Sequence, residues 1–312
     1  MNVEQFCSAS RVVIVAGKGG VGKTTVTAAF ATAAARAGAS VLIVEIEGKS
    51  GISSALGTPP LTYEEQPVAP GLRARTLTPD EALLEYLEER GLQRISRRLV
   101  RSGALDVIAT AVPGMKDILV LGKVKQLERA GAADLIVIDA PAAGHAITFL
   151  LAARGLLDAV RVGPVRTQAE EVQALLSDPD RCRVMLVTLA EETPVNELVD
   201  TAYALEDRVG VKLGPVVVNA VPDPLDVDGT AADDAAAAGV PVDARLAAAL
   251  DAAAAFRVER RALAVAQADR LARRLPLPQL RLPFVFGEIG PRQLDGLAAS
   301  LAAGVEDLPG GR

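Results

Sequence analysis

An α/β fold with a mostly parallel central sheet flanked by helices is predicted by the way short apolar runs alternate with longer helical patterns. The apolar runs are rich in valine, isoleucine and leucine, as expected for strands that are buried on both faces of a sheet. They occupy residues 11–17, 40–47, 134–141, 183–190 and 214–221. Amphipathic or alanine-rich helical patterns lie at residues 23–37, 144–154, 194–209 and 246–275. This order of elements is typical of repeated βαβ units.

The chain is long enough for one large domain, which we expect to span residues 1–312. Residues 78–130 break the alternation, because helical patterns follow one another there without a convincing strand between them. We expect this segment to be a helical subdomain inserted into the sheet domain. Residues 223–245 hold six aspartates and only one basic residue, Arg245, so we expect an acidic, mobile insertion there.

Charge and composition disfavour several classes of protein. The formal net charge of −6 suggests no general attraction to nucleic acid, and no nucleic-acid partner is expected. No run approaches the roughly 20 apolar residues that are needed to cross a bilayer, and the first residues lack the pattern of a secretory signal. The two cysteines, Cys7 and Cys182, cannot build a disulfide framework. We therefore expect a cytoplasmic protein.

The most specific motif joins the first predicted strand to the helix that follows it. The residues Gly17-x4-Gly22-Lys23-Thr24 fit a phosphate-binding loop, in which glycines let backbone N–H groups turn inward at a helix N-terminus. The lysine of this pattern reaches the terminal phosphates of a nucleotide, and the threonine hydroxyl holds Mg²⁺. The predicted nucleotide-binding residues are Gly19, Gly20, Val21, Gly22, Lys23, Thr24 and Thr25. The alternative is a glycine-rich turn that binds nothing, and the agreement of strand, spacing and helix argues against it.

A carboxylate at the end of the third predicted strand completes the predicted magnesium site. Asp139 lies where the buried run 134–141 ends. An aspartate at a strand end is a weak signal by itself. Together with the phosphate loop, it predicts that Asp139 and Thr24 are the residues that hold Mg²⁺.

The loop also contains a second lysine, Lys18, which the phosphate-binding pattern does not require. The stretch GKGGVGKT resembles the deviant Walker A motif of the ATPases that include the nitrogenase iron protein, the MinD and ParA partitioning ATPases, and the ArsA and tail-anchored-protein-targeting group. The resemblance implies a P-loop NTPase that hydrolyses ATP with Mg²⁺, and it implies catalytic roles for Lys18 and Lys23.

In that family, the lysine that matches Lys18 crosses a dimer interface to the partner's phosphates. Because this chain has one phosphate loop, the resemblance implies a homodimer or a heterodimer with a paralogue. In the alternative interpretation, Lys18 is an exposed cation near the phosphates of its own chain.

The resemblance extends to the second switch segment, which the family usually writes D-T-A-P-T-G-H. Asp139, Gly144 and His145 match this motif. Ala142 and Ala143 stand where the family has proline and threonine, so the threonine hydroxyl is missing. The resemblance favours a switch role for His145 over a place in the core.

The first switch segment predicts the residue that positions the attacking water. VEIEGKSGIS aligns with the family pattern S-T-D-P-A-H-N, so that Glu47 takes the place of its acidic residue. Glu45 is the neighbouring candidate, because side chains two residues apart share one face of a strand. In a third interpretation, one of these glutamates only caps the loop or forms an ion pair in it.

Two further segments are predicted to bind the base. Asn219 ends a buried strand and offers both a donor and an acceptor, as the edge of adenine requires. An asparagine at this point reads the base in the related ATPases. The stretch RLPFVFGEIG resembles P-L-x-x-G-E-I-R-G of the targeting branch, so Pro283, Phe284 and Val285 are predicted to cover the adenine. An ordinary edge strand is the alternative for this stretch.

The branch of the family is indicated by residues 112–128, which resemble a P-G-x-x-E helix motif of the ArsA and targeting branch, with Asp117 in place of glutamate. This implies nucleotide-driven closure that acts on an unidentified partner or cargo, with a protein client or a membrane partner as candidates. The sequence has no cysteine cluster for arsenite and no CxxC for zinc.

Two other functions stay open as alternatives. One is a MinD/ParA-like partitioning or membrane-positioning ATPase, for which residues 257–275 offer a basic helix. The other is a reductase with a cluster held by cysteines from two subunits, which two isolated cysteines disfavour.

Overall fold

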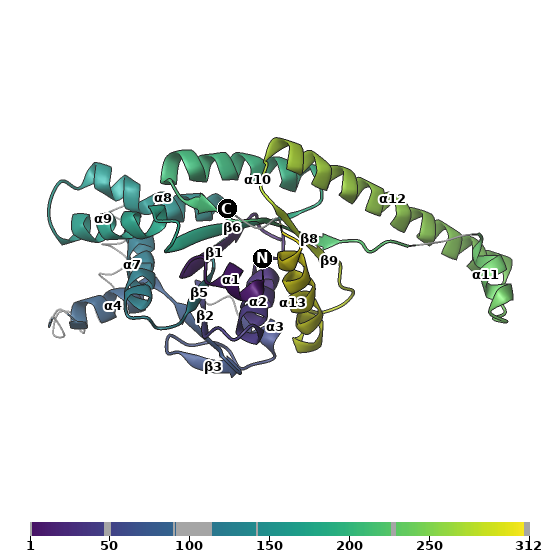
Figure 1. Cartoon of the computed structure of the whole chain (residues 1–312), viewed down its shortest axis with the longest axis horizontal. Helices are drawn as coiled ribbons and strands as arrows, with labels where there is room; N and C mark the ends of the chain where they lie inside the picture. The colour runs from purple at the N-terminus through teal and green to yellow at the C-terminus, as the bar shows by residue number, and fades with distance from the viewer. Residues whose placement is uncertain are drawn as a thin grey trace.

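The computed structural model describes residues 2–46, 51–89, 91, 114–141, 143–225 and 229–308. Within these residues the strands form one sheet in the order β3-β4-β2-β5-β1-β6-β8-β9, and β7 pairs with β6 (Figure 1). The strands are β1 (Val12–Gly17), β2 (Val41–Ile46), β3 (Gln66–Ala69), β4 (Leu72–Leu77), β5 (Leu135–Asp139), β6 (Cys182–Leu189), β7 (Lys212–Leu213), β8 (Val216–Val221) and β9 (Gln279–Pro283).

Helices cover both faces of this sheet (Figure 1). They are α1 (Val3–Cys7), α2 (Lys23–Arg36), α3 (Gly51–Leu56), α4 (Pro79–Glu89), α7 (Met115–Arg129), α8 (Ala143–Ala159), α9 (Pro164–Ser177), α10 (Glu192–Ala204), the π-helix η1 (Leu205–Val209), α11 (Ala231–Ala237), α12 (Ala244–Arg274) and α13 (Pro291–Glu306). Among the described strands only β3 and β4 pair antiparallel. The predicted α/β fold with a mostly parallel sheet is confirmed.

Each face of the sheet has its own hydrophobic core, as the two-residue period of a strand requires. Val12 and Ile14 of β1 pack into the core with α7, α8, α9 and α10. Val13 and Val15 pack into the opposite core with α2 and α13. Because β1 is buried on both faces and lies between β5 and β6, the loop at its carboxyl end has a rigid support.

The five predicted strands are all present, but the sequence did not predict β3, β4 or β7 as strands, nor α9 and α13 as helices. In β4 the reason is the polar pattern of its sequence, Leu-Arg-Ala-Arg-Thr-Leu. Arg75 is nevertheless buried: its guanidinium lies over the ring of Tyr63 at 4.4 Å from the centroid and pairs with Glu65 at 3.8 Å. A cation–π contact of this kind lets an arginine occupy a buried strand position.

In the part of the predicted helical subdomain, residues 78–130, that the structure describes, two helices are present, and they pack against each other. These helices are α4 and α7. Buried residues of α7, among them Ile118, Leu121 and Val124, belong to the core that covers the sheet. Residues 90 and 92–113 lie outside the described part, and the boundaries of the subdomain stay a prediction.

The acidic segment, residues 223–245, contains α11 and the start of α12. Helix α12 extends away from the body of the protein, and α11 packs against its far end (Figure 1). Only Ala247, Ala264, Ala268 and Leu271 of α12 are buried. The sequence predicted a helix over 246–275 but gave no sign that it projects. The expected mobility of residues 223–245 stays a prediction. Among the described residues, no helix combines the length and the apolar character that a membrane span requires.

Candidate functional site

The phosphate loop connects β1 to α2, and glycines are required for its shape. Gly20 and Gly22 have φ angles of 83° and 88°, which residues with a side chain rarely adopt. A Cβ atom added to Gly22 would also lie 2.2 Å from the side-chain nitrogen of Asn219. Gly22 is the N-cap of α2, so the first N–H groups of this helix lie at the loop. A helix N-terminus of this kind favours an anion.

The two lysines of the loop lie in different directions. The ammonium of Lys23 donates a hydrogen bond to the backbone carbonyl of Lys18 at 3.0 Å, which holds the Lys23 side chain across the loop. The ammonium of Lys18 instead forms an ion pair with Glu197 of α10 at 3.1 Å. The sequence did not predict the ion pair with Glu197.

Thr24 and Asp139 lie together, as the sequence predicted for a magnesium site. The Thr24 hydroxyl donates to Asp139 Oδ2 at 2.7 Å, and the Thr27 hydroxyl lies 3.4 Å from Asp139 Oδ1. Hydroxyl and carboxylate oxygens are the hard ligands that Mg²⁺ prefers. Asp139 is buried, and a cation beside it would offset the cost of that burial. These residues therefore fit a magnesium ion.

Burial raises the pKa of Asp139 above its ordinary value, although the hydrogen bond from Thr24 and the charge of Lys23 lower it. The charge of Glu45 adds to the increase. A raised pKa means that the ionised carboxylate destabilises the folded chain. Stability from this group is therefore present below the unfolded pKa, about 3.9, and it is lost as the pH rises through the folded pKa.

We expect Asp139→Asn to stabilise the nucleotide-free protein at pH 7, because it removes this buried charge. The expected increase in the midpoint of thermal unfolding is about 2–4 °C, and it should shrink as the pH is lowered towards 4. Thermal unfolding followed by circular dichroism measures it, with Asp207→Asn at an exposed position as the control. A lower midpoint at pH 7 would mean that the carboxylate stabilises the empty site.

Glu45 lies next to Asp139 in the sheet, and it is almost completely buried. Its carboxylate accepts hydrogen bonds from the backbone N–H of Ile52 at 3.3 Å and from the Thr76 hydroxyl at 3.4 Å. These contacts tie β2 to β4 and to the start of α3. Glu47, the preferred candidate for positioning water, lies outside the described residues, so the choice between the two glutamates stays a prediction.

Asn219 lies against the phosphate loop. Its side-chain amide donates a hydrogen bond to the backbone carbonyl of Val21 at 2.9 Å. The next residue, Ala220, has a φ of 55°, a left-handed conformation that is uncommon for a residue with a side chain. The amide therefore supports the loop from β8, and the predicted role of Asn219 in reading the base stays a prediction.

The predicted base-covering residues lie at the end of β9 and just beyond it. Pro283 is level with Val221 in the sheet, and Phe284 donates its backbone N–H to the carbonyl of Val221. Phe284 lines a cleft of about 400 Å³ at the carboxyl ends of β6 and β8. Ala220, which follows Asn219, lines the same cleft, whereas Val285 packs against the core. Among the predicted base-covering residues, only Phe284 lines this cleft, and their role in covering the adenine stays a prediction.

The residues of the second switch motif are only partly described. Asp139 is placed in full, whereas Ala142 and the side chains of residues 143–145 lie outside the described part. The role predicted for His145 therefore stays a prediction.

The two cysteines are both buried and belong to opposite cores. Burial raises the pKa of Cys7 and that of Cys182 to about 12. Because the thiolate is the form that binds metals, these protonated thiols are poor ligands for a cluster or for arsenite.

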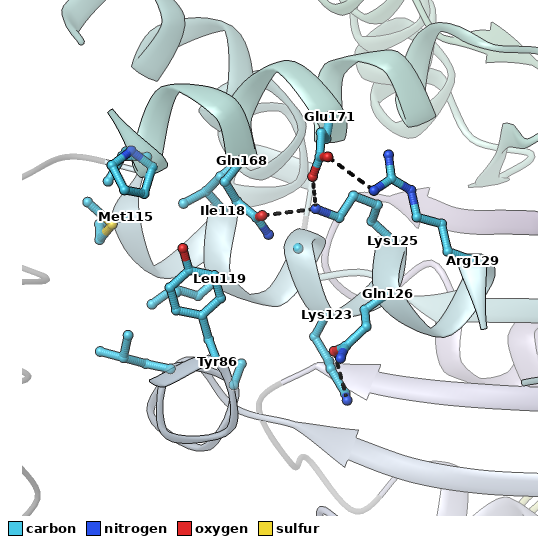
Figure 2. Close-up of a pocket in the computed structure, with 15 residues that line it drawn as sticks. Tyr86, Met115, Ile118, Leu119, Lys123, Lys125, Gln126, Arg129, Gln168 and Glu171 are labelled. Carbon is cyan, nitrogen blue, oxygen red and sulfur yellow. Dashed lines mark hydrogen bonds and ion pairs between the residues drawn. The ribbon is translucent and has the colours of Figure 1, made fainter. Parts of the chain in front are cut away.

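A second cavity, of about 330 Å³, lies between α4, α7 and α9 (Figure 2). Tyr86 and Met115 line one end of it, and Lys125 lines the other. Lys125 donates to Gln168 at 2.9 Å and pairs with Glu171, and its hydrogen bond holds the pKa of Glu171 below the ordinary value. The lysine charge is thus already compensated, so the cavity gives no reason to assign an anionic ligand. Client binding in this region stays a prediction.

The segment of the chain that is similar to known proteins includes the phosphate loop and Asp139. Residues 10–161 match the sequence profile of the family described as "Anion-transporting ATPase". This segment begins before β1 and ends just after α8, so it includes both loop lysines and Asp139.

Similar curated proteins are also ATPases by name. "ATPase BagA" of Mycobacterium tuberculosis is 37% identical over 226 residues, which cover 68% of this chain and 65% of that protein. "ATPase get3" of Schizosaccharomyces japonicus is 30% identical over 141 residues, or 44% of this chain and 42% of that protein. The "Arsenical pump-driving ATPase" of Acidiphilium multivorum is 27% identical over 216 residues, or 67% and 34%.

The chain thus spans slightly less than two thirds of the mycobacterial relative that it matches. The profile match, these relatives and the parallel sheet with its phosphate loop all agree. Over the matched segment, residues 10–161, the chain belongs to the ArsA-like family of anion-transporting ATPases.

Proposed function

We propose that this chain is an ATP-hydrolysing molecular switch that works as a dimer. The observation that supports this best is the divergence of the two loop lysines. Lys23 lies across its own loop, where it is placed to bind the phosphates of its own nucleotide. Lys18 lies beside α10 with 41% of its side chain exposed, so a second molecule can reach this side chain. In this proposal Lys18 reaches the triphosphate that a partner subunit holds.

The remaining residues of the site bind and orient the nucleotide. Lys23 and the N–H groups at the start of α2 bind the phosphates, and Thr24 and Asp139 hold Mg²⁺. When bound, the ion supplies positive charge that stabilises the transferred phosphoryl group. Asn219 and Phe284 orient the adenine. Glu47 positions the attacking water, with Glu45 as the second candidate.

The partner in the dimer is a second copy of this chain or a paralogue, because one chain supplies one phosphate loop. ATP binding brings the two chains together, and the closure acts on a partner or cargo in the cytoplasm. Thiolate capture of arsenite is not part of this proposal, since both thiols are buried and their pKa values are raised.

Small-angle X-ray scattering with ADP and with a non-hydrolysable ATP analogue tests the proposal. We expect a monomer with ADP and a compact dimer with the analogue. Turnover per chain should also rise with protein concentration until the dimer is saturated, because only the dimer has a complete site. A chain that stays monomeric with the analogue, yet turns over ATP at a rate independent of its concentration, would refute the dimeric switch. If this chain is monomeric and inactive, the paralogue arrangement predicts that a suitable paralogue restores both properties.

We expect Glu47→Gln to bind ATP and to hydrolyse it about 10²–10⁴ times more slowly, since it removes the carboxylate that orients the water. The variant should accumulate as an ATP-bound dimer, which size-exclusion chromatography with bound-nucleotide analysis detects. Glu45→Gln is the matched variant on the same face of the strand. Rapid hydrolysis by Glu47→Gln together with slow hydrolysis by Glu45→Gln would move the role to Glu45.

A further inference from the structure

The ion pair between Lys18 and Glu197 joins the phosphate loop to a helix that is not part of the predicted nucleotide site. The two side chains come from β1's loop and from α10, and their charged atoms are 3.1 Å apart. Both are only partly exposed, with 41% of the Lys18 side chain and 37% of the Glu197 side chain accessible. The pair is therefore near the surface but is not freely solvated.

Helix α10 is a rigid support for Glu197. Its residues Val195, Leu198 and Val199 are buried in the core on that face of the sheet. A small cavity of about 10 Å³ lies where the loop meets α10, and Lys18 and Pro194 are among the residues that line it. A space of this size barely holds one water molecule. The Lys18 ammonium thus meets a carboxylate whose backbone is held by a buried helix.

We infer that Glu197 is a positioning residue that holds Lys18 on its own chain until a partner's triphosphate replaces it. The inference rests on the proposed function, because it takes Lys18 as the residue that crosses between subunits. Among the described residues of the single chain, Lys18 forms its ion pair with the Glu197 carboxylate. In the closed dimer the phosphates compete for the same ammonium, so the ion pair must break in each chain before hydrolysis.

The strength of the pair suits a contact that must be broken in every cycle. A partly exposed ion pair between flexible side chains changes an equilibrium constant by about 1.5- to 5-fold. Several phosphate oxygens in a closed site attract the ammonium more strongly than one carboxylate at a surface. The pair therefore keeps Lys18 in place at small cost, and it does not prevent dimerisation once ATP is bound.

Glu197→Gln tests the inference, since it removes the charge and keeps the size of the side chain. We expect ATP-analogue-dependent dimerisation to tighten by about 1.5- to 5-fold for each chain released, and by about 2- to 25-fold in a homodimer with two such pairs. Sedimentation equilibrium measures the dissociation constant. Glu197→Asp should stay close to wild type because it keeps the charge. Glu206→Gln removes an exposed charge farther along the same helical stretch, and it should have no effect.

The effect of Glu197→Gln on dimerisation must depend on Lys18. In a Lys18→Ala background, Glu197→Gln should leave the dissociation constant unchanged, since there is no ammonium left to release. A role of Glu197 in the stability of α10 would persist in that background and would overturn the inference. Weaker dimerisation by Glu197→Gln in the wild-type background would also overturn it, because Glu197 would then act in the dimer.

A measurement on the nucleotide-free chain separates this inference from the dimeric switch. Acetylation by acetic anhydride, followed by mass spectrometry, reports how accessible the Lys18 amine is. We expect Glu197→Gln to speed Lys18 acetylation by about 1.5- to 5-fold, with the exposed Lys212 unchanged. An unchanged Lys18 rate would mean that Glu197 does not hold Lys18, whatever the result for dimerisation. If Glu197→Gln speeds Lys18 acetylation in a chain that never dimerises, the hold of Glu197 on Lys18 is supported. Only the proposed function is then refuted.

Discussion

Lys18→Ala is expected to lower ATP turnover by about 10³–10⁵-fold, the range found for a cation that a second protein supplies to a transferred phosphoryl group. Nucleotide binding should change little, because the Lys18 ammonium lies on α10 and Lys23 lies across the loop. The loss should therefore appear in kcat, with the dissociation constant for an ATP analogue almost unchanged. Phosphate release and isothermal titration calorimetry measure the two quantities.

A mixing experiment distinguishes a role in the partner's site from a role in the same chain. A dimer of Lys18→Ala with Glu47→Gln has one complete site, since the first chain keeps its glutamate and receives Lys18 from the second. If the chain forms a homodimer, an equimolar mixture should regain about a quarter of the wild-type turnover, because half of the dimers are mixed and each has one working site. If Lys18 and Glu47 both act only in the site of their own chain, mixing the two variants restores no turnover. Turnover by Lys18→Ala close to wild type would exclude the role in the partner's site altogether.

The central part of the fold was predictable because its strands are buried on both faces. A strand of this kind is a continuous apolar run, and each of the five predicted runs overlaps an observed strand. The strand β4 was missed because its buried arginine, Arg75, finds its partners, the ring of Tyr63 and the carboxylate of Glu65, outside the strand. The periodicity of hydrophobic residues along the sequence cannot reveal that a polar side chain is buried when its burial depends on residues outside its own strand.

The site was predictable where its residues form a local motif. The phosphate loop and Thr24 follow from the spacing of glycines, lysine and threonine, and the position of Asp139 follows from the end of a buried strand. The contacts of the loop with α10 and β8 were not predictable. Asn219 and Val21, for example, are 198 positions apart. They meet because β6 lies between β1 and β8 in the sheet. The sequence pattern does not specify this lateral order of the strands.

Lys23→Ala is expected to weaken nucleotide binding itself, in contrast to Lys18→Ala. The Lys23 ammonium lies over the loop that we propose binds the phosphates, and its removal takes away the cation that the loop itself supplies to them. The loss of one partner from a desolvated charge pair costs about 2–5 kcal/mol, so the dissociation constant for ATP should rise by about 30- to 5,000-fold.

Titration calorimetry with an ATP analogue measures this constant, and thermal unfolding of the nucleotide-free variant checks that the fold is intact. Lys23→Arg is the matched control, since it keeps the charge but carries a larger planar group than the compact ammonium. Tight binding by Lys23→Ala would contradict the assignment. The two lysines would then share one function, and the different directions of their side chains would no longer support separate roles in binding and hydrolysis. Loss of binding by Lys23→Ala, together with loss of turnover at unchanged binding by Lys18→Ala, would instead separate holding the nucleotide from hydrolysing it.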